Sequence, residues 1–177
     1  MHRQKQAMLW INVLGGVAVL GSYAQGLSTH PGAVDALWGG VPQGLRTLYT
    51  AGMLVAAAGY FAFTQFLLFQ LNPDEAQIGK RFGFGVFNGL YAAILVPSAL
   101  WMPLTFAWLA HPSGGLWWAI RLVLAVVGLA SLGLLEALLT VEPRRPAWAY
   151  WLAVAGSIGF CVQTAVLDAL IWPASFE

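Results

Sequence analysis

Five long apolar runs divide this 177-residue chain, and almost every charged residue lies in the gaps between them. Only 8% of the residues are charged and 59% are hydrophobic, whereas about a quarter of the residues of a soluble domain are charged. A surface of this composition could not be well hydrated. The pattern therefore predicts that lipid surrounds most of the folded chain.

The apolar runs have the length of membrane-spanning helices, which need about 20 mostly apolar residues. Helix is the expected structure because lipid offers the backbone no hydrogen-bond partners, and the alternating pattern of a β-barrel is missing. We expect an all-α integral membrane protein, with one five-helix transmembrane domain over residues 1–177. The predicted spans are about 8–27, 45–71, 82–110, 116–140 and 147–172.

The basic residues indicate how the spans are oriented. Five spans place the N-terminus, the second loop and the fourth loop on one side, and the positive-inside rule makes this side cytoplasmic. We expect a cytoplasmic N-terminus, a C-terminus on the opposite side, and a bacterial inner membrane. Six of the eight basic residues fall on the cytoplasmic side: Arg3, Lys5, Lys80, Arg81, Arg144 and Arg145.

Two segments near the N-terminus need interpretation. The basic residues before the first run resemble the start of a signal peptide, and we interpret the run as an uncleaved first span. The first outer loop, Ser28–Gly44, is the longest loop and contains a short apolar piece, Ala33–Trp38. We expect this piece to form a short helix over the mouth of the bundle.

Polar residues at membrane depth are costly, and they are the first candidates for function. For the inner layer, hydrogen bonding between helices is the favoured interpretation, and a proton or ligand site is the alternative. The inner layer holds Asn12, Gln65, Asn88 and Glu136, and the outer layer holds Tyr23, Gln25, Arg46, Tyr49, Arg121, Gln163 and Asp168.

Arg121 and Asp168 carry opposite charges in neighbouring antiparallel spans. At a rise of about 1.5 Å per residue, their depths differ by only about 3 Å. An ion pair between them is one interpretation. The others are that Arg121 extends to the outer interface, or that one of the two charges contacts a ligand.

Most of the nine tryptophans fall where membrane proteins generally carry them, in belts at the two interfaces. Trp101 differs because it lies well inside the third span, between Pro97 and Pro103. Proline breaks the hydrogen-bond ladder of a helix, so we predict an interrupted helix here, with Trp101 in a cavity wall. The belt residues are Trp10, Trp148 and Trp151 on the inner side, and Trp38, Trp108, Trp117, Trp118 and Trp172 on the outer side.

Two segments resemble a known family. Leu100–Phe106, LWMPLTF, is similar to the Leu-Trp-x-Pro-x-x-Phe stretch in the third helix of the tryptophan-rich sensory protein/translocator protein (TspO/MBR) family. Leu48–Met53, LYTAGM, is similar to the start of that family's second helix. The five spans, the small size and the long first loop also resemble it. The sequence departs from the family at Ser98, where the family has Asn, and at Arg121, where it has an acidic residue.

The resemblance implies a pocket among the helices, beneath the first outer loop, for a flat apolar ligand such as a porphyrin or a sterol. It implies that aromatic faces stack on the ligand ring and that Arg121 pairs with a propionate. The resemblance thus implies a tetrapyrrole or a sterol-like molecule as the ligand and a binding protein or sensor rather than an enzyme, and no motif indicates a separate cofactor. The implied lining residues are Trp38, Tyr49, Trp101, Phe106, Arg121 and Gln163.

Several other classes of protein lack support in the sequence. No His/Glu cluster has the spacing of metal ligands, no Ser-His-Asp set is present, and a formal charge of +1 gives no reason to expect nucleic-acid binding. Three alternatives stay open. They are an accessory subunit or homodimer that packs on partner helices or pigments, an enzyme on a lipid that uses Glu136 or Asp168 as acid or base, and a transporter.

Overall fold

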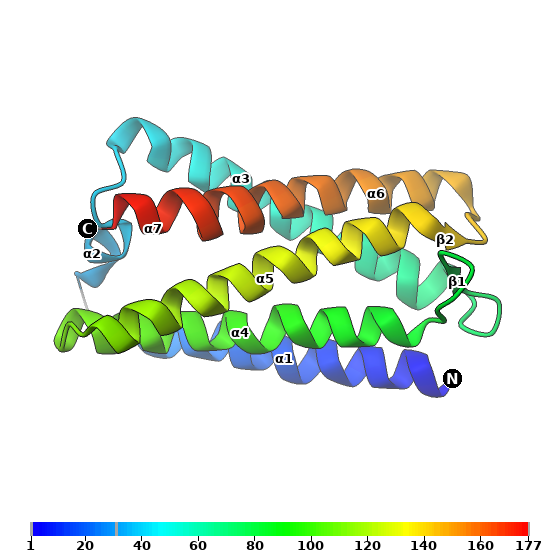
Figure 1. Cartoon of the computed structure of the whole chain (residues 1–177), viewed down its shortest axis with the longest axis horizontal. Helices are drawn as coiled ribbons and strands as arrows, with labels where there is room; N and C mark the ends of the chain where they lie inside the picture. Colours follow the sequence, from blue (N-terminus) through cyan, green and yellow to red (C-terminus); the bar gives the residue numbers. More distant parts are fainter. Residues whose placement is uncertain (1, 31, 177) are drawn as a thin grey trace.

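The computed structural model of the chain is a bundle of five long antiparallel helical segments (Figure 1). It describes residues 2–30 and 32–176, without the side chains of Ala33 and Val34. Each long segment is apolar enough to span a membrane, so the predicted fold class is confirmed. The segments are Arg3–Thr29 (α1), Gln43–Gln70 (α3 and η1), Gly85–Ala110 (α4), Gly114–Thr140 (α5) and Ala147–Ser175 (α6, η2 and α7).

Two of the long segments change helix type along their length. The second span begins as an α-helix and ends in a π-helix, and the last span has a long π-helical part between two α-helical parts. The divisions are Gln43–Gln65 (α3), Phe66–Gln70 (η1), Ala147–Cys161 (α6), Val162–Ile171 (η2) and Trp172–Ser175 (α7).

The third span is continuous, because α4 runs through both Pro97 and Pro103. The predicted interruption of this helix is therefore wrong. Hydroxyl groups add hydrogen bonds along the same stretch: Ser98 Oγ donates to the carbonyl of Ile94 at 2.7 Å, and Thr105 Oγ1 donates to that of Trp101 at 2.8 Å. Neighbouring side chains of this kind make proline tolerable within a membrane helix.

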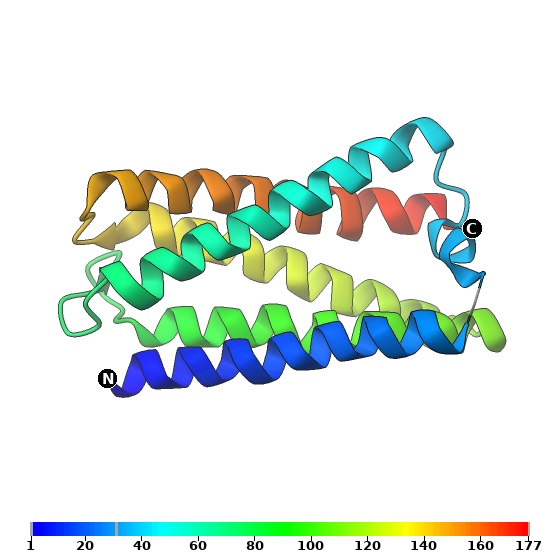
Figure 2. The same ribbon diagram turned by 180° about the vertical axis from the view of Figure 1, so that it is seen from behind.

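The helices follow one another around the bundle in the order α1, α4, α5, α6 with η2, and α3. The ring closes between α3 and α1 in the half of the bundle that contains the N-terminus, where the Tyr60 hydroxyl donates to Asn12 Oδ1 at 2.6 Å. From there towards α2, the ribbons of α1 and α3 diverge (Figure 2). Ala57 and Met53 lie one and two turns before Tyr60 on the same side of α3, and both are exposed. We call this stretch the α1–α3 seam.

A small hairpin closes one end of the bundle, which we call the hairpin end. Strand β1, Gln77–Ile78, pairs antiparallel with β2, Val141–Glu142, and so joins the second and fourth loops. Two-residue strands of this kind leave no pattern in the sequence, and they were not predicted. The N-terminus lies at this end and the C-terminus at the other (Figure 1), as an odd number of spans requires.

The opposite end is covered by α2, Ala33–Trp38, and we call it the α2 end. The predicted short helix in the first outer loop is therefore confirmed. It is held against the last span, because the indole nitrogen of Trp172 donates to the carbonyl of Leu37 at 3.0 Å.

The interior is divided into two clusters of buried side chains. One extends from the middle of the bundle to the hairpin end and includes Phe63, Phe66, Phe87, Tyr91 and Tyr150. The other lies at the α2 end, and we call it the α2-end cluster. Its buried members are Val41, Tyr49, Ile120, Leu124, Leu167, Trp172 and Phe176, with Trp38, Trp101, Trp108 and Trp117 among the side chains packed against them.

Candidate functional site

The site begins with the π-helical segment η2, which carries Gln163 and Asp168. In a π-helix, each backbone carbonyl accepts a hydrogen bond from the N–H group five residues later, and such turns are frequent at functional sites. Its wider turn brings residues five apart onto one side of the helix. Accordingly, Gln163 Nε2 donates to Asp168 Oδ1 at 2.8 Å.

Helix α3 packs against η2 through two residues near its start. The Tyr49 hydroxyl donates to the carbonyl of Leu167 at 2.8 Å. One turn further on, Gly52 makes room for Gln163, because a Cβ at Gly52 would overlap the Gln163 side-chain oxygen. Tyr49 and Gln163 are both buried, so the structure brings together two of the residues expected to line the pocket.

Two of the predicted lining residues have a buried polar atom without a hydrogen-bond partner within the described residues: Gln163 Oε1 and Trp101 Nε1. Such atoms are uncommon in protein interiors, because an unmade hydrogen bond is costly. Ser157 Oγ and Asn88 Oδ1 share this property. Gln163 differs from those two because its amide nitrogen is bonded to a carboxylate.

Trp101 lies between α1 and the last span. Its ring is edge-on to Tyr23 at 6.0 Å and to Trp172 at 5.7 Å between centroids. Helix α3 reaches the residue before Asp168, because the Tyr49 hydroxyl donates to the carbonyl of Leu167. Asp168 itself is partly exposed.

The aromatic rings of the α2-end cluster fill the space beneath α2. Trp172 and Phe176 stack with centroids 4.2 Å apart at 29°, and Trp117 and Phe176 stack at 6.0 Å and 13°. The sequence placed Trp172 in the outer belt, but it is 5% exposed. Trp10, Trp118, Trp148 and Trp151 are all exposed, as belt positions should be.

Two of the predicted lining residues lie at the margins of the cluster. Trp38 is half-buried on α2, with its ring 5.9 Å from that of Tyr49 and the Arg46 guanidinium 5.7 Å from its centroid. Phe106 is buried on the opposite side of the bundle, where α4 meets α1. It stacks on His30 at 4.2 Å and 6°.

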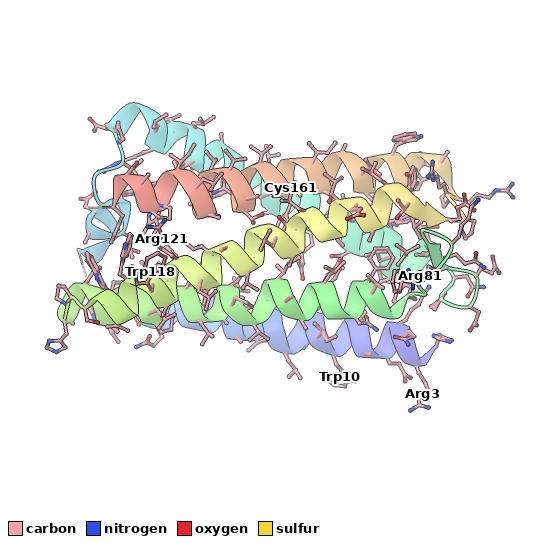
Figure 3. All side chains as sticks on the ribbon, viewed as in Figure 1. Arg3, Trp10, Arg81, Trp118, Arg121 and Cys161 are labelled. Carbon is pink, nitrogen blue, oxygen red and sulfur yellow. The ribbon has the colours of Figure 1, made fainter. Side chains whose placement is uncertain are left out.

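Arg121 lies outside the cluster, on the exposed side of α5. Its guanidinium is 5.0 Å from the ring centroid of Trp118. Figure 3 shows these two residues near the α2 end, and Arg3 and Arg81 at the opposite end. Within residues 2–30 and 32–176, Arg121 and Asp168 form no ion pair, so the pairing that helix register allowed is not made.

The four inner-layer residues do not form a common site. Asn12 bonds to Tyr60 at 2.6 Å, and Asn88 bonds to Gln4 at 2.6 Å. Glu136 is exposed and Gln65 is partly buried. No hydrogen bond joins one of the four to another among the described residues, so the layer consists of separate contacts.

A second polar contact, between α5 and the last span, was not anticipated. Thr164 Oγ1 donates to Ser131 Oγ at 2.8 Å, and Cys161 Sγ donates to the carbonyl of Ser131 at 3.1 Å. All three side chains are buried. Serine and threonine are too common on membrane helices for the sequence alone to mark them.

The hollow at the hairpin end is unrelated to the α2-end cluster. It is an open depression of about 480 Å³, lined by Glu75, Gln77, Glu142, Pro143 and Arg144. In the part of the chain that the structure describes, no three His, Cys, Asp or Glu side chains are placed to hold a metal ion.

Comparisons of the chain with protein-family models, with curated proteins and with solved structures found no match.

Proposed function

We propose that this chain is an integral membrane binding protein that takes a flat apolar ligand at the α2-end cluster. The observation that carries the proposal is the position of Phe176, whose ring stacks on both Trp172 and Trp117. Offset stacking is a favourable arrangement for aromatic rings. A cluster that holds one flat ring in this way offers the same indole faces to a flat ligand.

The α1–α3 seam supports a route from the lipid. Tyr23 and Met53, on α1 and α3 respectively, are 37% and 47% exposed, and Trp101 lies directly behind Tyr23. An apolar ligand dissolved in the bilayer would enter between α1 and α3 and reach Trp101 first. It would then take the position of the Phe176 ring.

The proposal keeps four of the six ligand-binding residues that the TspO/MBR resemblance implies. Trp38, Tyr49 and Trp101 belong to the α2-end cluster, and Gln163 packs against Gly52 beside Leu167 of the cluster. Arg121 and Phe106 are assigned no ligand contact, because they lie elsewhere. From the basic residues of the hairpin end, we place the cluster on the non-cytoplasmic side of a bacterial inner membrane.

The test is a binding titration of the purified chain in a non-ionic detergent. The neutral flat probe 1-pyrenemethanol accepts energy from tryptophan, and protoporphyrin serves as the tetrapyrrole that the resemblance implies. We expect saturable binding of 1-pyrenemethanol at about micromolar concentration. Trp101→Ala should weaken it about tenfold or more, because aromatic anchors dominate binding. Trp10→Ala, which removes an indole that is 61% exposed, should leave it unchanged.

Two results would contradict the proposal. One is energy transfer that rises linearly with probe concentration, as simple partition into the detergent micelle would give. The other is an equal loss of affinity in Trp101→Ala and Trp10→Ala.

A second candidate function, an accessory subunit of a membrane complex, is favoured by the position of α1. Only 6% of its apolar window is buried, and Leu14, Val17 and Leu20 are 64–70% exposed. A face of this kind suits either lipid or a partner helix. Purification of the tagged chain under mild conditions would distinguish the two. A fixed stoichiometric partner that Leu14→Ala with Val17→Ala removes would favour the subunit.

A further inference from the structure

Among the residues that the structure describes, no basic side chain pairs with Asp168. Both basic side chains of the spans at the α2 end are engaged elsewhere: Arg46 pairs with Asp35 at 3.4 Å, and Arg121 lies over Trp118. Among the described residues, the only hydrogen bond to the carboxylate comes from Gln163. A carboxylate removed from water is costly unless a positive charge, several donors or a proton compensates it.

The polar groups around Asp168 offer more free hydrogen-bond acceptors than free donors. Gln163 is 4% exposed, and its Oε1 is an unpartnered acceptor. The carboxylate can accept further bonds, since two oxygens provide about four sites. The one unpartnered donor of the α2-end cluster is Trp101 Nε1, as far as the described residues show. A ligand with N–H donors would therefore satisfy more of this site than a ligand with acceptor oxygens.

The neighbouring aromatic rings also favour a positively charged ligand. Aromatic faces attract cations, and tryptophan does so most strongly. The cluster offers five indoles, on Trp38, Trp101, Trp108, Trp117 and Trp172, next to the segment that carries Asp168. Arg46 already lies over the ring of Trp38. An acid such as a porphyrin propionate would instead meet the carboxylate of Asp168. Arg121 could not neutralise it there, because Arg121 lies on the exposed side of α5.

From this arrangement we infer that the ligand is an amphipathic cation, a flat apolar ring system that carries a protonated amine, with Asp168 as its counter-ion and Gln163 as a second acceptor. The inference rests on the proposed function, because it names the class of ligand for the same site. The π-helical turn forms the site, because it aligns Gln163 with Asp168 while Gln163 packs against Gly52 of α3.

Three probes of the same flat ring test the inference: 1-pyrenemethylamine, 1-pyrenemethanol and 1-pyrenecarboxylate, which are positive, neutral and negative at pH 7. Each is titrated into the full chain in non-ionic detergent, and energy transfer from tryptophan is recorded. We expect the amine to bind at least about tenfold more tightly than the alcohol, as a hydrogen bond to a charged group gives, and the carboxylate to bind most weakly.

Two variants make the test specific to Asp168. Asp168→Asn keeps the size of the side chain and the oxygen that accepts from Gln163, so the variant should fold, and it should remove the preference for the amine while the alcohol still binds. Glu136→Gln neutralises an exposed carboxylate on α5 and should keep the preference. A loss of preference in both variants would show a general surface effect and overturn the inference.

The outcomes separate this inference from the proposed function. If the three probes bind with equal affinity and Trp101→Ala weakens all of them, the flat-ligand site stands and the cation inference is wrong. If none of them binds saturably, the proposed function fails and the inference fails with it. If Asp168→Asn does not fold, the more conservative Asp168→Glu keeps the charge and should retain the preference for the amine.

Discussion

At the core of the bundle towards the hairpin end, aromatic rings meet edge to face, whereas at the α2 end several are stacked nearly parallel. Phe63 meets Tyr60, Tyr91 and Phe160 at 67°, 80° and 78°. Phe176 meets Trp117 and Trp172 at 13° and 29°. The edge-to-face contacts around Phe63 interlock the rings of neighbouring helices. Parallel rings can separate to admit another flat ring.

The two regions also differ in how their polar groups are paired. The tyrosines of the first region bond to other side chains: Tyr60 to Asn12 at 2.6 Å and Tyr91 to Thr64 at 2.7 Å. At the α2 end, Gln163 Oε1 and Trp101 Nε1 have no partner within the described residues, and Asp168 has no counter-charge. Ser157 Oγ and Asn88 Oδ1 also lack partners among the described residues, so what sets the α2 end apart is an open acceptor beside a carboxylate. In our proposal, the first region holds the helices together and the second receives a ligand.

The largest effect on stability is expected at Phe63, which is fully buried. Phe63→Ala should lower the free energy of unfolding in detergent by about 2–3 kcal/mol. This is less than in soluble proteins, because the cavity term remains but the transfer term largely vanishes in an apolar surrounding. Phe61→Ala, two residues away and 73% exposed, should change it by less than about 0.5 kcal/mol. Thermal unfolding of both variants checks the difference, and equal melting temperatures would show that this region is not a specific core.

Phe176→Ala should separate ligand binding from stability. Because a ligand would no longer have to displace the stacked ring, the affinity for 1-pyrenemethanol should rise about tenfold, although the unliganded chain should melt at a lower temperature. Phe69→Ala, which removes a ring that is 73% exposed, serves as control. Weaker binding by Phe176→Ala would mean that Phe176 supports the site rather than occupying it.

The smallest effect on the free energy of unfolding is expected where α1 and α3 meet. Tyr60→Phe removes the hydrogen bond to Asn12 and should cost only about 0.6–1 kcal/mol, as is usual between membrane helices. It should also open the α1–α3 seam further towards the hairpin end and speed the association of the pyrene probe in stopped-flow measurements. An unchanged association rate would argue against entry through the seam.

The sequence was sufficient to predict the five helices, because lipid requires about 20 apolar residues of each span. It also placed Tyr49, Gln163 and Asp168 at one depth. It could not predict how each helix is rotated, because spans such as α4 and α6 are apolar on all sides. That is why Trp172 is buried although a belt position was expected, and why Arg121 lies on the exposed side of α5.

The bond between Gln163 and Asp168 was also beyond the sequence. Residues five apart do not share a face of an α-helix, so the pair carries no signal unless the π-helical turn of η2 is known. The interruption expected at Pro97 and Pro103 failed for a similar reason, because neighbouring hydroxyls and packed helices stabilise α4 through both prolines.

Photolabelling with a diazirine derivative of 1-pyrenemethanol, followed by mass spectrometry of the labelled peptides, tests the contrast between the two regions most directly. Our account predicts that the label falls on Trp101–Trp108 and Leu167–Phe176, and that excess 1-pyrenemethanol competes it away. Label spread evenly over the exposed faces of all five spans, or concentrated near Phe63 and Tyr91 and unaffected by competitor, would contradict it.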